Sequence, residues 1–481
     1  MTFTSFNFLL LLPLFVALYQ VVPRRARTLF LLVVSYACYC AWSWKAAVAL
    51  AAVTVFTFVA GKFVGDSNSE HSVRFVFPLA IQGLVFYLAI FKIAAVAPVG
   101  RFAGYAIPLG LSYYTFKLMS YLIDVHWGKI PASTNLVEFS AAIAFFPQLS
   151  AGPIQRPADF LEQVPPPKTA LWKGAARFVW GLAKKVLIAD NLAPAVDYVY
   201  SHLGGPTGGQ TGGLHGAGLV AGFYLFPLQL YADFSALSDM ALGMGMMFGI
   251  HGPENFNRPY TATSIGDFWR RWHMSLTTWL ADYVFTPLRM ATRAFGTSGL
   301  VFSIVVNMVA IGIWHGLTWG YLVFGLVNAV YLVLDALTSR KRANFFKSRP
   351  GFNRLGSWLG WLLTIHLVFI AMVFFRARSV ADAIWLLGHA ASQFGRGKHE
   401  LSLLMTAAGM RALLMGLAGY AVLELAERYR PDQWWLRFEA NSPRWVQWPV
   451  RFLVATCVVV ALFLLTVRSA NHASAFLYQV F

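Results

Sequence analysis

His315 lies in the middle of a long uncharged stretch, where an ionisable side chain could carry out proton transfer. No Asp, Glu, Lys or Arg occurs between Arg293 and Asp335, and His315 stands near the centre of that run. An ionisable group in a hydrocarbon-like segment is costly, so such residues are rare and usually functional. Imidazole exchanges a proton near neutral pH. His315 could therefore be a proton-transfer group inside a membrane or a histidine that caps a helix at the interface, and the uncharged run alone does not separate the two.

A second histidine, His273, closes a basic and aromatic segment. It follows Arg270 and Arg271, which stand between Trp269 and Trp272. Two adjacent guanidinium groups could bind a phosphate or a carboxylate bidentately. Arginines beside tryptophans are also typical of the cytoplasmic edge of a membrane protein, and the sequence alone favours this anchoring role for the arginines.

Carboxylates interrupt other apolar regions of the chain. Asp233 and Asp239 lie in one such region, and Asp124 ends another apolar run. Carboxylates within membrane segments commonly pair with other protein groups. We therefore expect these aspartates to cap helices or to pair with the arginine-rich segment, and substrate chemistry is the less favoured alternative.

The motifs do not indicate a metal site or a nucleotide-binding loop. The chain has no His-x-x-x-His, no His-Glu-x-x-His and no Walker loop. Gly312, Gly316 and Gly320 recur every four residues. Such spacing usually marks a face for helix packing, and it would also let a substrate approach His315 closely.

The composition predicts an integral membrane protein. Of 481 residues, 58% are hydrophobic and 12% are charged, about half the charged fraction of soluble domains. The formal net charge of +18 comes largely from short basic clusters such as Arg340–Arg342, which the positive-inside rule places in cytoplasmic loops. This charge could also attract an anionic substrate such as an acyl-coenzyme A. Cys38, Cys40 and Cys457 lie in apolar segments, and we expect inert thiols.

The apolar runs predict about a dozen helices, two or three of them re-entrant or half-length. We expect one integral domain over residues 1–481, with a retained first helix because no basic residue precedes position 24. The segment 252–290 is too polar to face lipid, and residues 338–355 should form a basic connection. The predicted spans are 7–23, 28–42, 45–64, 73–96, 102–123, 139–151, 174–190, 214–232, 236–250, 274–290, 298–314, 317–336, 356–375, 402–425 and 447–468.

An ordered set of motifs along nearly the whole chain resembles the membrane-bound O-acyltransferase family. The resemblance is strongest to its bacterial branch, which includes the membrane subunit of alginate O-acetylation and the D-alanyl transfer protein of teichoic acid synthesis. The motif-rich part of the chain extends from about residue 100 to about residue 380. The matching segments are Ser35–Tyr36, Tyr113–Phe116, Ser120–Val125, Phe146–Leu149, Ala151–Ile154, Tyr231–Asp239, Pro253–Tyr260, Phe268–His273, Trp314–Gly316, Phe374–Ala377 and the C-terminal aromatics Phe476, Tyr478 and Phe481.

The resemblance implies that His315 is the catalytic histidine and that His273 occupies the family's second recurrent polar position. It implies helices arranged in a ring around a thinned centre, with a tunnel that an acyl donor enters from the cytosol and an acceptor from the opposite side. The chain departs from the family pattern at His126 and at Ala236–Leu237. Neither position touches the two histidines, so acceptor preference rather than activity is in question.

These expectations combine into one functional hypothesis. His315 would act as the general base in a multi-pass protein of the bacterial inner membrane that passes acetyl groups from acetyl-CoA to an exported polysaccharide such as alginate or cellulose. A periplasmic partner protein would complete the transfer. No tightly bound cofactor is expected. His273 or Asn255 would orient the thioester or the acceptor.

Further residues are candidates for contact with the donor or acceptor. They are Arg270, Arg271, Trp314, Asp233 and Asp239. Alternative functions are D-alanyl or peptidoglycan O-acyl transfer, a transporter, or a structural subunit of a polysaccharide export complex.

Overall fold

The computed structural model describes residues 3–65, 75–96, 108–166, 169–203, 214, 216–392, 402, 405–406, 409–429, 441–443, 445–452 and 456. Within these ranges the regular elements are helices, and no strand occurs. The prediction of an all-α chain is confirmed. The loop around Gly204–Gln210, Cys457 and the C-terminal aromatics lie outside the described residues.

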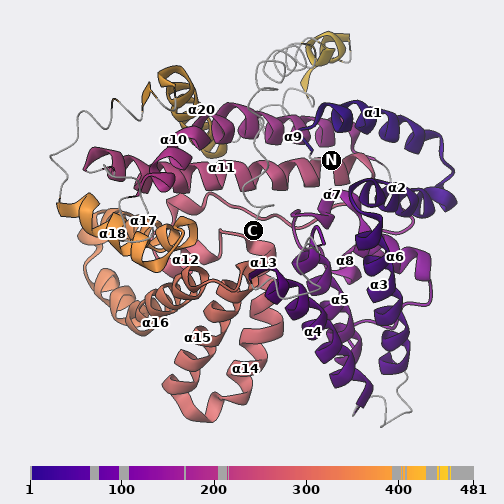
Figure 1. Ribbon diagram of the computed structural model, residues 1–481, viewed down its shortest axis with the longest axis horizontal. Coiled ribbons are helices and arrows are strands. Elements are labelled where there is room, and N and C mark those ends of the chain that lie inside the picture. The colour runs from indigo at the N-terminus through magenta and orange to yellow at the C-terminus, as the bar shows by residue number, and fades with distance from the viewer. Residues whose placement is uncertain are drawn as a thin grey trace.

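The N-terminal third forms a group of helices around an apolar core, on the right in Figure 1. Its elements are α1 (Phe6–Val21), η1 (Arg24–Ala26), α2 (Arg27–Trp42), α3 (Trp44–Gly65), α4 (Phe77–Val96), α5 (Leu111–His126), α6 (Leu136–Ala144), α7 (Phe146–Leu149) and α8 (Pro157–Leu161). Leu50, Tyr114 and Phe139 are completely buried in this core. Asn135 begins α6 because its side chain accepts hydrogen bonds from two backbone amides of the first turn.

Two helices cross the middle of the molecule side by side. They are α9 (Leu171–Ala183), which continues through the π-helical η4 (Lys184–Ala189) into α10 (Asp190–Ser201), and α11 (Ala217–Met247). They approach closely, since a Cβ on Gly174 would lie 2.5 Å from the carbonyl oxygen of Gly243. The prediction of two spans at 214–232 and 236–250 is wrong. One 31-residue helix covers both, because Asp233, at the expected break, forms a buried ion pair with Lys185.

The polar segment 252–290 begins as irregular backbone with two short helices, and from Met274 to Ala291 it is one continuous helix with a π-helical middle, which confirms a helix over the span predicted at 274–290. Its elements are η5 (Pro259–Thr261), α12 (Ile265–Trp269), α13 (Met274–Leu280), η6 (Ala281–Phe285) and α14 (Thr286–Ala291). Ser264 begins α12, where its hydroxyl accepts a hydrogen bond from the Asp267 amide at 3.2 Å. Figure 1 shows α12 and α13 near the centre of the molecule, between the N-terminal group and the later helices.

The later helices are longer and lie at the lower left and left of Figure 1. They are η7 (Arg293–Phe295), α15 (Gly296–His315), α16 (Trp319–Ser348), η8 (Pro350–Phe352), α17 (Asn353–Arg376), α18 (Val380–Ser392) and, at the top, α20 (Met410–Tyr429). The predicted basic connection over 338–355 is wrong in its first part, because α16 continues to Ser348. Lysine and arginine are good helix formers, so the helix extends beyond its apolar part.

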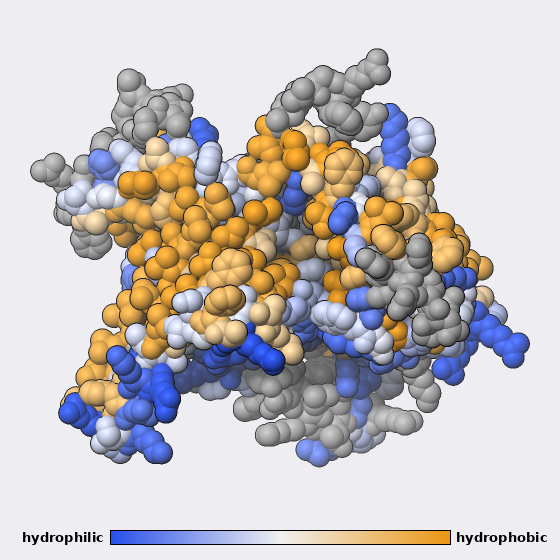
Figure 2. Space-filling model, turned by 90° about the horizontal axis from the view of Figure 1, so that it is seen from below, coloured by the Kyte–Doolittle hydropathy of each residue, from blue (hydrophilic) through white to orange (hydrophobic). Residues whose placement is uncertain are grey.

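Among the residues that the structure describes, five helices are long and apolar enough to cross a membrane by length and composition, and they cover 44–65, 77–94, 293–315, 319–348 and 350–376. A shorter apolar helix covers 7–21. Large apolar side chains such as Leu79, Phe86 and Leu363 are exposed on these helices. Figure 2 shows broad apolar areas on one face of the molecule, with hydrophilic residues gathered mainly along its lower margin. This distribution is that of a multi-pass membrane protein, whose apolar side chains face lipid.

Candidate active site

His315 is the last residue of α15, and the local backbone explains why the helix ends there. Gly316 leaves the helix in an extended conformation while its amide still donates to Gly312 at 3.2 Å. A Cβ on Gly316 would lie 2.7 Å from the ring of Tyr321, and one on Gly312 would lie 2.4 Å from the Tyr321 carbonyl oxygen. The glycine spacing therefore allows α15 and α16 to pack closely at the turn that carries His315.

Aromatic rings surround the imidazole of His315, which is 8% exposed. Ring centroids lie 4.8 Å away for Phe375, 6.0 Å for Tyr321 and 6.2 Å for Phe324. Such an environment excludes bulk water, and a base in it is not solvated by competing donors.

His273 stands immediately before α13 with a left-handed backbone, φ 45°. This conformation is uncommon for a residue with a side chain. It is held by Asn255, whose backbone oxygen accepts from the Met274 amide at 2.9 Å and whose Oδ1 lies 3.3 Å from His273 Nδ1. His273 is outside the candidate spans and almost completely buried. Burial lowers its pKa to about 3, so the ring is neutral at physiological pH.

Asn255 is the centre of a buried hydrogen-bond network that joins α11 to α13. Its Nδ2 donates to Ser238 Oγ at 3.0 Å. Its Oδ1 accepts from the Ser275 hydroxyl at 2.6 Å and from the Ser275 amide at 3.3 Å. The amide side chain is therefore fixed in one orientation, and it fixes His273 in turn.

The indole of Trp314 contacts the rings of both histidines. Its centroid is 4.9 Å from the ring of His315 and 5.5 Å from that of His273. Tyr113 and Phe116 of α5 pack against the same indole, with centroids at 5.3 and 6.1 Å. The structure thus brings together four of the residues that the sequence singled out, which are His315, His273, Trp314 and Asn255; their roles remain predictions.

The two arginines before His273 make their ion pairs away from this cluster. Arg271 Nε lies 3.0 Å from Asp267 and Arg270 NH2 lies 3.6 Å from the same carboxylate. The side chain of Arg270 is 72% exposed and that of Arg271 is 31% exposed. This placement agrees with an anchoring role, and it also leaves Arg270 accessible to an anion in solution.

Asp233 and Asp239 belong to a separate buried network of charges. Asp233 lies 2.8 Å from Lys185, and Asp239 lies 2.5 Å from Lys184 and 3.0 Å from Arg177. The expected pairing within the protein is present, but its cations come from α9 and η4 rather than from the arginine-rich segment. These contacts hold α11 to α9 and η4, so substrate binding by the two aspartates is not supported.

Lys92 lies beside the site and was not among the residues predicted from the sequence. Lys92 of α4 donates a hydrogen bond from Nζ to the backbone oxygen of Trp314, and both Lys92 and His273 lie within electrostatic range of the His315 ring. Lys92 is the sole charged residue between positions 77 and 96. The criterion that singled out His315, an ionisable residue in an apolar run, would have found it.

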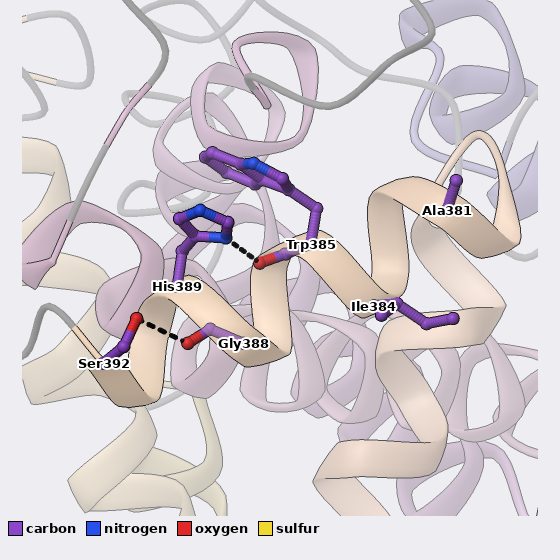
Figure 3. A pocket seen from close by; sticks show the side chains of 6 residues that line it. All are labelled: Ala381, Ile384, Trp385, Gly388, His389 and Ser392. Atoms are coloured by element: carbon purple, nitrogen blue, oxygen red, sulfur yellow. Dashed lines mark hydrogen bonds between the residues drawn. The ribbon is translucent and has the colours of Figure 1, made fainter.

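A hollow on the surface of α18 contains none of these residues. It encloses about 610 Å³ and is bordered by Ala381, Ile384, Trp385, Gly388, His389 and Ser392. In Figure 3 the His389 ring lies beside that of Trp385 and its Nδ1 bonds to the Trp385 backbone oxygen at 2.9 Å. Because this histidine hydrogen-bonds its own helix, the hollow is a surface feature of α18 and not a candidate active site.

The cluster around Trp314 can support proton transfer at a buried hydroxyl group. It holds two imidazoles, an oriented amide and a lysine ammonium among aromatic side chains. These are the groups that general base catalysis and stabilisation of a developing oxyanion require.

Comparisons with known proteins identify the family of the chain. The chain matches the model of the MBOAT, membrane-bound O-acyltransferase family, over residues 130–375. It is 36% identical to a probable alginate O-acetylase of Azotobacter vinelandii over 82% of this chain and 79% of that protein. A probable alginate O-acetylase of Pseudomonas aeruginosa is 35% identical, with 89% and 81% covered. A peptidoglycan O-acetyltransferase of Helicobacter pylori is 30% identical over 58% and 56%.

The region matched by the family model contains both histidines, Asn255 and Trp314, and it covers the apolar helices over 293–315 and 319–348 and nearly all of the one over 350–376. The chain belongs to the membrane-bound O-acyltransferase family and is an O-acyltransferase.

Proposed function

We propose that this enzyme transfers an acetyl group from acetyl-CoA to a hydroxyl group and so contributes to O-acetylation of an exported polysaccharide. The observation that carries the proposal is that two buried histidines, His273 and His315, both contact the indole of Trp314. Alginate is the first candidate polymer, because relatives similar over most of their length are named probable alginate O-acetylases.

In the proposed reaction His315 acts as the general base. It removes the proton of the acceptor hydroxyl as the oxygen attacks the thioester carbon, and a new carbon–oxygen bond forms. The carbon–sulfur bond then breaks, and the imidazolium returns the proton to the departing thiolate. An aromatic, water-excluding environment suits this step because hydrolysis of the thioester competes with transfer.

Asn255 and His273 serve this reaction by orientation. Asn255 is fixed by α11 and α13 together, so it holds the neutral imidazole of His273 in one position. That imidazole then orients either the thioester or the acceptor next to His315. The exposed guanidinium of Arg270 is suited to an anionic donor such as coenzyme A at the protein surface.

The proposal also includes a direction across the membrane. The donor enters from the cytosol through a tunnel, and the acetyl group leaves on the periplasmic side of a bacterial inner membrane, where a partner protein completes transfer to the polymer. His315 lies at the end of a 20-residue helix, and such a helix is about 30 Å long, enough to cross the hydrocarbon core. A position near one mouth of the tunnel therefore fits better than the bilayer midplane.

Purified protein with labelled acetyl-CoA tests the proposal. We expect His315→Ala to abolish thioester turnover while the protein remains folded. His366→Ala is the matched control, because His366 also lies in an apolar helix but bonds to Tyr224 at 2.9 Å; this variant should remain active. Normal turnover by His315→Ala would overturn the proposed base, and absence of turnover in the wild type with any acceptor would overturn acetyl-CoA as the donor.

A further inference from the structure

Lys92 makes a contact that the reaction proposed above does not use. It lies half-buried near the C-terminal end of α4, and its Nζ donates a hydrogen bond to the backbone oxygen of Trp314. Trp314 immediately precedes His315. A charged residue within a candidate span is costly, so we expect its contact with Trp314 to have a structural or functional role.

The end of α15 needs such a donor. The last four carbonyl groups of a helix have no partner within the helix, and Gly316 departs from helical geometry directly after His315. The Trp314 carbonyl is one of these groups, and Lys92 binds it. An ammonium ion is also favourable at this end, where the helix dipole places partial negative charge.

The contact connects two parts of the core. Lys92 belongs to α4, which packs with α3 and α5 in the N-terminal group, whereas Trp314 belongs to the larger cluster around the site. Leu88, one turn before Lys92, packs against both clusters. Tyr113 of α5 contacts the indole of Trp314, so the N-terminal group holds this residue by its side chain and by its backbone.

We propose that Lys92 is a positioning residue for acyl transfer: its hydrogen bond to Trp314 fixes the end of α15 and thereby the orientation of the His315 imidazole. The proposal rests on the role of His315 as base. An error of about 1 Å in the position of a catalytic group can lower the rate by about a hundredfold. Loss of the hydrogen bond therefore lowers the rate of the chemical step rather than the affinity for the donor.

Lys92→Met and Lys92→Arg distinguish the positioning of His315 from a general contribution of Lys92 to folding. Methionine preserves the apolar stem and removes the donor, and arginine restores a cationic donor of greater length. We expect Lys92→Met to lower kcat about ten- to a hundredfold with the KM for acetyl-CoA changed less than about twofold, and Lys92→Arg to recover much of the loss. Rates are referred to folded, monodisperse protein.

Lys117→Met is the matched control. Lys117 is also a buried lysine that donates to a helix carbonyl, that of Ala142 at 3.2 Å, but this carbonyl belongs to α6 and not to α15. Per folded molecule, its kcat should remain near that of the wild type. Equal losses of kcat in the Lys117 and Lys92 variants would overturn the positioning role, as would an unchanged kcat in Lys92→Met.

The outcome is distinguishable from failure of the proposed function. If His315→Ala is inactive and Lys92→Met is fully active, the base stands and the role of Lys92 is wrong. If His315→Ala is active, the base itself is wrong. If His315→Ala and Lys92→Met both lose activity while Lys117→Met keeps it, both the base and the positioning role stand.

Discussion

Removal of the Asn255 side chain should both destabilise the protein and disable the site. In Asn255→Ala the hydroxyls of Ser238 and Ser275 lose a partner, and the Ser275 amide loses its acceptor at 3.3 Å. The hydroxyls can rotate toward other acceptors, but the amide lies in the first turn of α13, where no carbonyl of the helix can bind it. His273 also loses its 3.3 Å contact with Oδ1.

The expected loss of unfolding free energy follows from these contacts. A buried polar group left without its partner costs about 1–3 kcal/mol, and the Ser275 amide together with the weakened His273 contact gives about 2–4 kcal/mol for Asn255→Ala. Turnover per folded molecule should also fall, because the left-handed backbone of His273 no longer has the support of Asn255.

Denaturant unfolding in detergent, followed by tryptophan fluorescence, measures the first effect, and acetyl-CoA turnover per folded protein measures the second. Asn191→Ala is the control. Its side chain donates to the Val186 and Leu187 carbonyl oxygens at 2.9 and 3.0 Å, contacts that join α10 to η4 and involve neither histidine, so it should lose stability and keep turnover. An Asn255→Ala protein with the wild-type unfolding midpoint and wild-type turnover would refute the reasoning.

Substitutions at three further positions test separate parts of the structure. His273→Gly and His273→Ala should both lose activity, but the glycine variant should be about 1 kcal/mol more stable in unfolding experiments, since φ is 45°; equal stabilities would contradict a left-handed residue. Lys185→Met leaves the buried Asp233 carboxylate without its 2.8 Å partner and should destabilise by about 3–5 kcal/mol, which poor recovery of folded protein after membrane extraction would reveal. Gly312→Leu should separate α15 from Tyr321 and lower turnover, whereas unchanged turnover would show that the close packing is not needed.

The sequence identified most of the site because its signals are local. His315 stands out as an ionisable residue in an uncharged run, and His273 and Asn255 stand out through their motifs. Their mutual arrangement was not predictable. It depends on the contacts of Trp314 with both histidine rings and on the hydrogen bond between Asn255 and Ser238 of α11. The His273–Trp314 and Asn255–Ser238 contacts join segments that are distant along the chain.

The error in the predicted spans over 214–250 has a physical explanation. The expected break includes Asp233, and carboxylates in apolar sequence are costly when unpaired, but Lys184 and Lys185 of η4 neutralise Asp239 and Asp233 of α11. A charge is destabilising in a span when it is alone, and the sequence does not give its partner. Lys92 itself meets the criterion of an ionisable residue in an apolar run, but its acceptor is a backbone carbonyl, a group that every residue carries, so the sequence does not indicate its partner.

The buried ion pairs lie apart from the candidate active site, and this arrangement affects how the site works. The paired charges lie between α9, η4 and α11 and hold the scaffold together, while the rings nearest His315 belong to aromatic residues. In such an environment a hydrogen bond is stronger than in water, so a single ammonium or amide has a large effect on where an imidazole points. The site therefore depends on a few oriented donors, Asn255 and Lys92 among them, and substitutions there should affect the rate more than any change to the paired charges, whose loss is expected to act through folding.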